Sequence, residues 1–151
     1  MRPDLPIETT LEVRDRCLCL KVQRAARALA RRFDDALRPF GLTNGQFSIL
    51  MSLNRPAPPR ISDLAEFLAM DRTTLTAALK PLQRRGLILV TADPEDLRGR
   101  LPVLTDAGRD LLVAALPVWR GAHDRVDALL DGRAQGDLRG DLDALCGQAL
   151  P

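Results

Sequence analysis

The segment from Ile61 to Gly86 constrains the fold most, because it reads as two short helices joined by a tight turn. We expect the first helix from about Ser62 to Leu68 and the second between Asp71 and Gly86. Ser62 and Asp71 are suitable N-cap residues, and Gly86 suits the left-handed conformation that often ends a helix. At 100° per residue, the second helix separates apolar from polar side chains. The apolar side carries Leu75, Ala78, Leu79 and Leu82, and the other side carries Thr73, Ala77, Lys80 and Arg84, with Thr76 beside them.

The second helix is also strongly cationic. No Asp or Glu occurs between positions 72 and 92, whereas Arg72, Lys80, Arg84 and Arg85 all do. A capped helix that is apolar behind and cationic in front suits the major groove of DNA. An ordinary amphipathic surface helix has the same pattern, so the segment that follows must separate the two interpretations.

That following segment predicts a β-hairpin. Leu87–Thr91 and Leu101–Leu104 are short β-type runs, and the residues between them, Asp93–Arg100, have turn chemistry. Pro102 restricts the second run to an edge strand. A hairpin directly behind a helix-turn-helix is the wing of a winged helix, which favours the DNA-binding interpretation.

Long helices are predicted on both sides of this unit. A stripe from Leu18 to Ala36 predicts one amphipathic helix from about Thr10 to Leu37. Thr105 should cap another long helix, kinked at Pro117. After the interruption at 131–137, a last helix should carry Leu138, Leu142, Leu145 and Ala149. These stripes exceed what a compact winged helix needs, so we expect the terminal helices to interleave in a homodimer.

Composition restricts the class of protein only broadly. The chain has 151 residues and a net charge of +2, which fits one domain but is too mild to prove a nucleic-acid partner. No apolar run approaches the roughly 20 residues of a membrane span, and no signal peptide opens the sequence. We therefore expect a cytoplasmic protein without membrane association. The cysteines, Cys17, Cys19 and Cys146, lack metal-ligand spacing, and we expect neither metal nor cofactor.

Particular residues, in this order of elements, resemble the MarR/SlyA family of winged-helix transcriptional regulators. The resemblance covers nearly the whole chain and depends on the combined order and spacing of short pieces. The pieces are Gly41-Leu42-Thr43 with Gln46-Phe47, Leu64-Ala65, Asp71-Arg72-Thr73-Thr74-Leu75-Thr76, Leu82-Gln83-Arg84-Arg85-Gly86-Leu87, Asp93-Pro94-Glu95-Asp96-Leu97-Arg98, and Leu104-Thr105 with Gly108.

The resemblance implies a single domain over residues 1–151, mostly α-helical with a small β-hairpin wing. Residues 41–104 would form the winged helix-turn-helix lobe, and residues 10–40 and 105–150 the N- and C-terminal dimerisation helices. It also implies a homodimer that binds a pseudo-palindromic operator in double-stranded DNA, most simply as a repressor, and that a small aromatic or lipophilic effector releases. The expected DNA contacts are Arg72, Thr73, Thr74, Thr76, Lys80, Arg84, Asp96, Arg98 and Arg100.

Within this set, Arg98 takes the place of the wing-tip arginine. A narrow minor groove concentrates negative potential, which makes an arginine there physically sensible. Asp96 is in the place from which the family orients that arginine. Two departures, Ala77 and Leu97, stand where basic residues are frequent, so fewer charge contacts are expected. Pro81 should bend or locally open the recognition helix.

Alternatives remain for several residues. Phe33, Phe40, Phe47, Met51 and Trp119 are candidates to line an effector crevice, or are simply core residues. Cys17 is in the region where peroxide-sensing members keep a reactive thiol, but the chain has no Tyr and a buried structural cysteine is the plainer interpretation. Cys17 and Cys19 on one helix would diverge by about 200° and could not easily pair.

Two further classes of protein are alternatives to a DNA-binding regulator. His123, the sole histidine, lies in a polar stretch and is expected at the surface. Neither a Ser-His-Asp or Cys-His set nor a Gly-rich phosphate loop can be completed, so we expect no enzyme. A helical dimer that does not bind DNA is the remaining alternative, and it predicts no salt-dependent affinity for a duplex.

Overall fold

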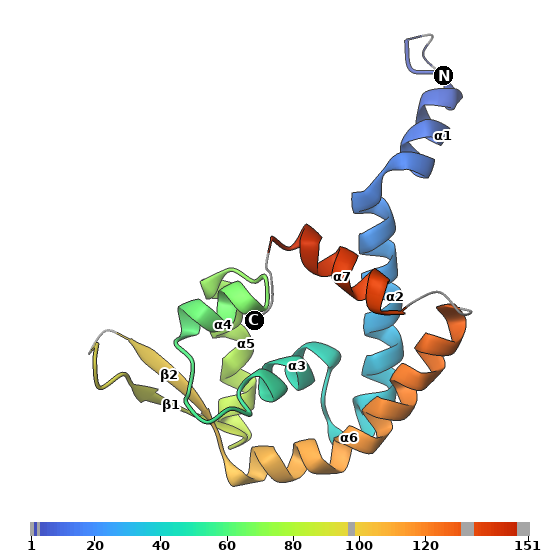
Figure 1. The fold of residues 1–151 in the computed structure, drawn as a ribbon. Coiled ribbons are helices and arrows are strands. Elements are labelled where there is room, and N and C mark those ends of the chain that lie inside the picture. The colour runs from blue at the N-terminus through green and yellow to red at the C-terminus, as the bar shows by residue number, and fades with distance from the viewer. Residues whose placement is uncertain (1, 3, 97–98, 131–134, 148–151) are drawn as a thin grey trace.

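A computed structural model gives the fold and describes residues 2, 4–96, 99–130 and 135–147. The described chain is mostly helical with one antiparallel hairpin, which confirms the predicted fold class (Figure 1). The elements, in chain order, are α1 (Ile7–Arg16), α2 (Leu18–Leu37), the short 3-10 helix η1 (Arg38–Phe40), α3 (Asn44–Ser52), α4 (Ile61–Phe67), α5 (Arg72–Arg84), β1 (Ile88–Ala92), β2 (Arg100–Leu104), α6 (Asp106–Asp127), η2 (Ala128–Leu130) and α7 (Gln135–Leu145).

A single apolar core holds α3, α4, α5 and the hairpin together as one lobe. The side chains of Leu50, Leu64, Leu75, Leu82 and Ile88 are almost completely buried in it. Burying such a side chain contributes about 1.5–3 kcal/mol each. The predicted apolar side of the second helix is therefore the side that faces the core, and its polar side is left at the surface.

The helix starts follow the capping chemistry read from the sequence, with one exception. Thr43 and Gln46 form a reciprocal capping box at α3, and Thr105 accepts a hydrogen bond from the Gly108 N–H at α6. The prediction for Ser62 is wrong, because α4 begins one residue earlier, at Ile61, which packs against the core. Ser62 is thus already helical and its hydroxyl donates to the neighbouring Asp63.

Left-handed residues form the turns on either side of α5. Ala69 has φ of 51° in the turn after α4, where the Met70 N–H donates to the Ala65 carbonyl at 2.8 Å. After α5, Gly86 has φ of 69°, as predicted, and the Leu87 N–H returns to the Leu82 carbonyl. These turns fix the direction in which α5 enters and leaves the lobe.

The hairpin strands pair in a regular antiparallel register. Ile88 lies opposite Leu104 and Val90 opposite Pro102. Both strands start one residue away from the predicted runs, at Ile88 and at Arg100. In a two-stranded sheet each strand has a free edge, so Pro102 is tolerated although it lacks an N–H group.

The predicted single N-terminal helix is wrong, because the chain breaks at Cys17. This residue is extended, with φ of −71° and ψ of 104°, and it caps α2 by accepting the Leu20 N–H on its Sγ atom. The shorter α1 buries none of its side chains, so no packing holds it in line with α2. Figure 1 shows α1 extending away from the rest of the molecule.

The helix α6 links the lobe to α2 and continues through Pro117. It curves between the two (Figure 1). Its C-terminal half packs beside α2, where Phe33 and Ala122 are buried. The α7 helix begins within the segment predicted to interrupt the chain and exposes Leu138, Leu142 and Leu145. None of the helices in the described ranges has the length and apolar character needed to cross a bilayer.

Candidate nucleic-acid interface

The start of α5 is held by its N-cap, Asp71. The Asp71 carboxylate accepts the Thr74 N–H at 2.8 Å and also the Thr74 hydroxyl. The hydrogen bond from the Thr74 hydroxyl lowers the pKa of Asp71 most, and the hydrogen bond from the Thr74 amide lowers it further. A charged cap therefore orders the turn from which the exposed side chains of Arg72 and Thr73 project.

The predicted threonine contacts are not equivalent in the structure. The Thr74 hydroxyl donates to Asp71, and the Thr76 hydroxyl donates to the Arg72 carbonyl at 2.7 Å. Phosphate oxygens only accept hydrogen bonds, so these hydroxyls must turn away from their helical partners before they can donate to DNA. The Thr73 hydroxyl donates to no other described residue, so it can donate to a phosphate without first breaking a hydrogen bond.

The exposed face of α5 carries a shallow groove of about 540 Å³. Arg72 and Lys80 lie at its two ends and the small side chain of Ala77 lies between them. Arg84 continues the same face toward the end of the helix. The groove is thus cationic at both ends and unobstructed in the middle, as a surface that follows a DNA strand should be.

A second groove, of about 430 Å³, joins α5 to the hairpin. It brings together predicted contacts that are distant in sequence, because Arg72 and Thr76 of α5 meet Asp96 and Arg100 of the wing there. Arg98 lies outside the described residues, so its contact stays a prediction. The remaining lining residues are Arg60, Ile61, Ser62 and Gly99.

Two residues of this region, Arg60 and Asp93, were given no role in the predicted site. Arg60 donates from Nε to the Asp93 Oδ2 atom at 2.8 Å. The Glu95 N–H also donates to the Asp93 carboxylate, at 2.9 Å. The hydrogen bond from the Glu95 amide lowers the pKa of Asp93 most. Burial raises this pKa, but the hydrogen bond from Arg60 lowers it further, so the pKa is lowered on balance. Arg60 follows a proline-rich loop and Asp93 begins a turn 33 residues later, so no local sequence pattern could predict their contact.

Comparison with known proteins identifies the family of this fold. The MarR family model matches residues 42–99. The Rhodopseudomonas palustris transcriptional activatory protein BadR is 30% identical over 127 residues, which are 82% of this chain and 72% of that protein. The chain belongs to the MarR family.

Solved structures of transcriptional regulators agree with this assignment. The Mycobacterium tuberculosis regulator MosR, in complex with DNA, is 39% identical with a TM-score of 0.79, covering 87% of this chain and 94% of that one. A probable transcriptional regulator from Pseudomonas aeruginosa is 33% identical with a TM-score of 0.77, covering 87% and 98%. The likeness therefore extends over the lobe and the long helices of this MarR-family chain.

Most of the predicted effector residues lie in packed structure. Phe33 and Phe47 are buried, and Phe40 is half-buried. Phe47 stacks on Trp119 with ring centroids 5.7 Å apart. Met51 lines a small apolar pocket, of about 190 Å³, with Leu112 and Leu116. In this MarR-family chain the aromatic residues thus join the lobe to α2 and α6.

The expectation that His123 is a surface residue is wrong. Its imidazole ring lies 4.2 Å from the Trp119 ring and 4.6 Å from the Phe33 ring, measured between centroids. This half-buried position lowers the pKa of His123, because burial disfavours the charged form. His123 follows Trp119 by four residues in α6, so the helical period already places the two side chains on the same face.

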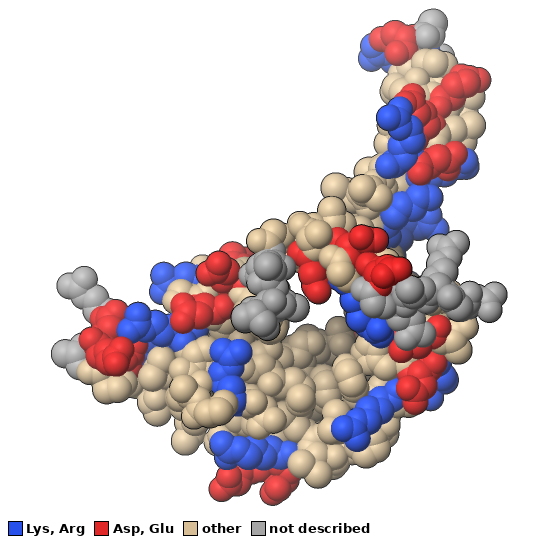
Figure 2. All heavy atoms as spheres, in the orientation of Figure 1, with Lys and Arg blue, Asp and Glu red and all other residues tan. Residues whose placement is uncertain are grey.

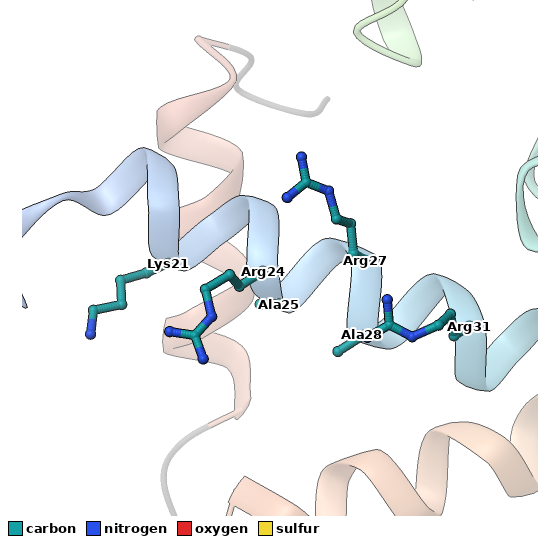
Figure 3. Close-up of a pocket in the computed structure, with 6 residues that line it drawn as sticks. All are labelled: Lys21, Arg24, Ala25, Arg27, Ala28 and Arg31. Carbon is teal, nitrogen blue, oxygen red and sulfur yellow. The ribbon is translucent and has the colours of Figure 1, made fainter. Parts of the chain in front are cut away.

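A second cationic region of this MarR-family chain runs along α2. Figure 3 shows Lys21, Arg24, Arg27 and Arg31 projecting from the helix, with small alanine side chains between them. By contrast, α1 pairs its own charges, as Arg14 bonds Asp15 and Arg16 bonds Glu12. Figure 2 shows the resulting mixture of basic and acidic side chains on α1. None of these α2 residues is among the predicted DNA contacts.

The three cysteines are free thiols. Cys17 is half-buried at the break between α1 and α2, while Cys19 and Cys146 are exposed. Because Cys17 is not helical, the argument that two thiols of one helix diverge does not apply to Cys17 and Cys19. Within the described residues, no cluster of His, Cys, Asp or Glu has the geometry of a metal site.

Proposed function

We propose that this MarR-family transcriptional regulator binds a pseudo-palindromic operator as a homodimer and acts chiefly as a repressor. The observation that carries the proposal is the groove joining α5 to the wing, which unites Arg72 and Thr76 with Arg100 on one surface. Lys80 and Arg84 extend that surface along α5. An exposed helix with cationic and hydroxyl side chains suits the major groove, and an adjacent hairpin suits the neighbouring minor groove.

The exposed apolar side chains support a second copy as the partner of the terminal helices. Leu18, at 65% exposed, and Val22, at 38%, continue the stripe of α2 beyond its buried end. Leu138 and Leu142 form a matching stripe on α7. Apolar surface of this extent on two helices favours burial against the same helices of a partner.

Such a dimer explains how occupation of DNA would regulate transcription. Two α5 helices would enter successive major grooves about 34 Å, or roughly 10 base pairs, apart. Phosphate neutralisation would supply most of the affinity, and the bound protein would block access to a promoter. In this proposal the chain works in the cytoplasm and catalyses no reaction.

Release by a small aromatic or lipophilic effector is part of the same proposal. The apolar pocket beside Met51, Leu112 and Leu116 lies where α3 meets α6. A ligand there would act on the connection between the lobe and the long helices, and could change the spacing of the two lobes. The redox alternative at Cys17 stays a prediction: operator binding would be titrated with hydroperoxide in wild type and Cys17→Ser, and equal release curves would end it.

Selection of duplexes from a random pool tests the proposed function directly. We expect an enriched site with two-fold symmetry and half-sites about 10 base pairs apart. The logarithm of the binding constant should then fall linearly with the logarithm of salt concentration. A purified protein that is monomeric and enriches no sequence at low ionic strength would contradict the proposal.

A further inference from the structure

Among the described residues, Asp93 is the one charged residue whose side chain is buried. It is 4% exposed, at the point where β1 ends and the wing turn begins. A buried carboxylate is costly unless partners satisfy it. The partners of Asp93 therefore show what this position is built to hold.

These partners come from three parts of the chain. The Glu95 N–H binds the carboxylate from within the turn, and the Asp93 N–H donates to the Gly99 carbonyl, which leads into β2. Position 99 has no room for a side chain, since an added Cβ atom would lie 2.8 Å from the Asp93 Cβ atom. The third partner is Arg60, from outside the wing.

Arg60 belongs to the other half of the lobe. It is the N-cap residue of α4, the first helix of the helix-turn-helix, and its Nη2 atom also lies 3.6 Å from the Glu95 carboxylate. It lines the groove that contains Arg72 and Thr76. The ion pair between Arg60 and Asp93 thus spans from the helix-turn-helix to the start of the wing turn.

We propose that Arg60 is a positioning residue that fixes the wing against α4, so that the wing and α5 meet DNA at a set separation. A two-stranded hairpin is marginally stable on its own, and a tie at its turn removes freedom that DNA binding would otherwise have to remove. The inference rests on the proposed function, because it concerns how the same interface is held.

Hydrogen exchange in the DNA-free protein tests the tie independently of any operator. We expect Arg60→Gln to speed the exchange of the amides of Asp93 and Gly99, while amides in the middle of α5 exchange as in wild type. Arg60→Lys keeps the charge but loses the planar fork of donors, so it should speed the same amides. Unchanged exchange of the wing amides in both variants would overturn the proposal.

Operator binding supplies a second test. If Asp93 acts only through its negative charge, its replacement should have the opposite effect on DNA affinity from the one expected if it holds the wing. Asp93→Asn removes a negative charge close to DNA, so electrostatics alone predicts tighter binding. Loss of the tie predicts binding weaker by roughly 3- to 10-fold, with the salt slope little changed. Glu95→Gln is the matched control: it removes the same charge and leaves the Arg60–Asp93 pair, so it should bind as tightly as wild type or more tightly.

The outcomes separate the tie from the proposed function. Tighter binding by Asp93→Asn, equal to that of Glu95→Gln, would show that Asp93 acts only through its charge and would overturn the tie. Should Asp93→Asn fail to fold, Arg60→Lys carries the same test, because Arg60 is half-exposed. If wild type binds no duplex, the proposed function fails, and the exchange data still decide whether Arg60 holds the wing.

Discussion

The Arg85 guanidinium donates from Nη1 to the Gly41 carbonyl at 2.6 Å, and from Nη2 to the Phe40 carbonyl at 3.3 Å. It thereby ties the last turn of α5 to the chain segment that enters the lobe. Gly41 has φ of 62°, and the guanidinium lies against it. Arg85 is one of the basic residues counted in the recognition helix, but the structure uses it to join two elements.

Arg84 and Arg85 should therefore respond differently to the same substitution. Arg84→Ala removes an exposed charge on the α5 surface, so it should weaken operator binding and leave the melting temperature close to that of wild type. Arg85→Ala removes charged hydrogen bonds worth about 1 kcal/mol, and should lower the melting temperature. Thermal denaturation and DNA titration of both variants measure this. Equal effects of the two substitutions on both quantities would contradict the assignment.

Lys80→Ala tests phosphate contact along the α5 groove. If Lys80 neutralises one phosphate, binding to all sequences should weaken alike, and the slope against the logarithm of salt should fall by about one unit. Titrations of operator and unrelated duplexes at several salt concentrations give both values. Lys21→Ala, the same charge change on α2, is the control and should leave the slope unchanged. An unaltered slope in Lys80→Ala would place Lys80 away from phosphate.

Local chemistry was sufficient to predict the parts of the fold that depend on neighbouring residues. Thr43, Asp71 and Thr105 cap their helices because each oxygen reaches an amide three residues on. Gly86 ends α5 in the left-handed region for the same kind of local reason. The division of α5 into core and surface sides also follows directly from the helical period.

Properties that depend on distant partners could not be predicted in this way. The first stripe, from Leu18 to Ala36, lies wholly within α2, and it carries no sign of the break at Cys17 or of the lack of buried side chains in α1. His123 has polar neighbours in sequence but aromatic neighbours in space. Arg60 and Asp93 belong to two loops whose contact exists only once the lobe has folded.

Charge placed on the exposed apolar stripes should separate the subunits. Val22→Asp and Leu142→Asp each put a carboxylate on a stripe that we propose is buried in the dimer, where an unpaired charge is costly. Sedimentation should show a shift toward monomer, with helical content little changed. Leu89→Asp, on the 56% exposed wing residue, is the control and should remain dimeric. Dimers of normal affinity in both stripe variants would exclude α2 and α7 from the interface.

The Asp71 cap makes the stability of α5 depend on acid. The hydrogen bonds from Thr74 lower the pKa of this carboxyl in the folded protein, so its contribution is complete above the ordinary pKa of Asp and is lost as the pH falls through the folded value. For the wild type we expect part of the loss in melting temperature between about pH 5 and pH 2 to come from Asp71. Asp71→Asn keeps a capping oxygen without titrating, so its profile should be flatter there. A profile parallel to that of wild type would refute this.

Gly108, in the first turn of α6, should tolerate no side chain. A Cβ atom at this position would lie 2.3 Å from the Leu87 carbonyl oxygen and 2.7 Å from the Leu104 Cδ1 atom, and the first of these is backbone that cannot turn aside. Gly108→Ala should therefore push α6 away from the root of the hairpin, at a cost of about 1–3 kcal/mol.

The matched control lies in the same helix. A Cβ atom at position 121 would meet only the end of the flexible Arg125 side chain, at 3.7 Å. Gly121→Ala should thus raise stability by about 0.5–1 kcal/mol, the usual gain from replacing glycine inside a helix. Chemical denaturation of both variants measures the two effects, which should have opposite signs. A Gly108→Ala protein as stable as wild type would mean that α6 does not pack on Leu87 and Leu104 as closely as described, and the wing would then lack its support from α6.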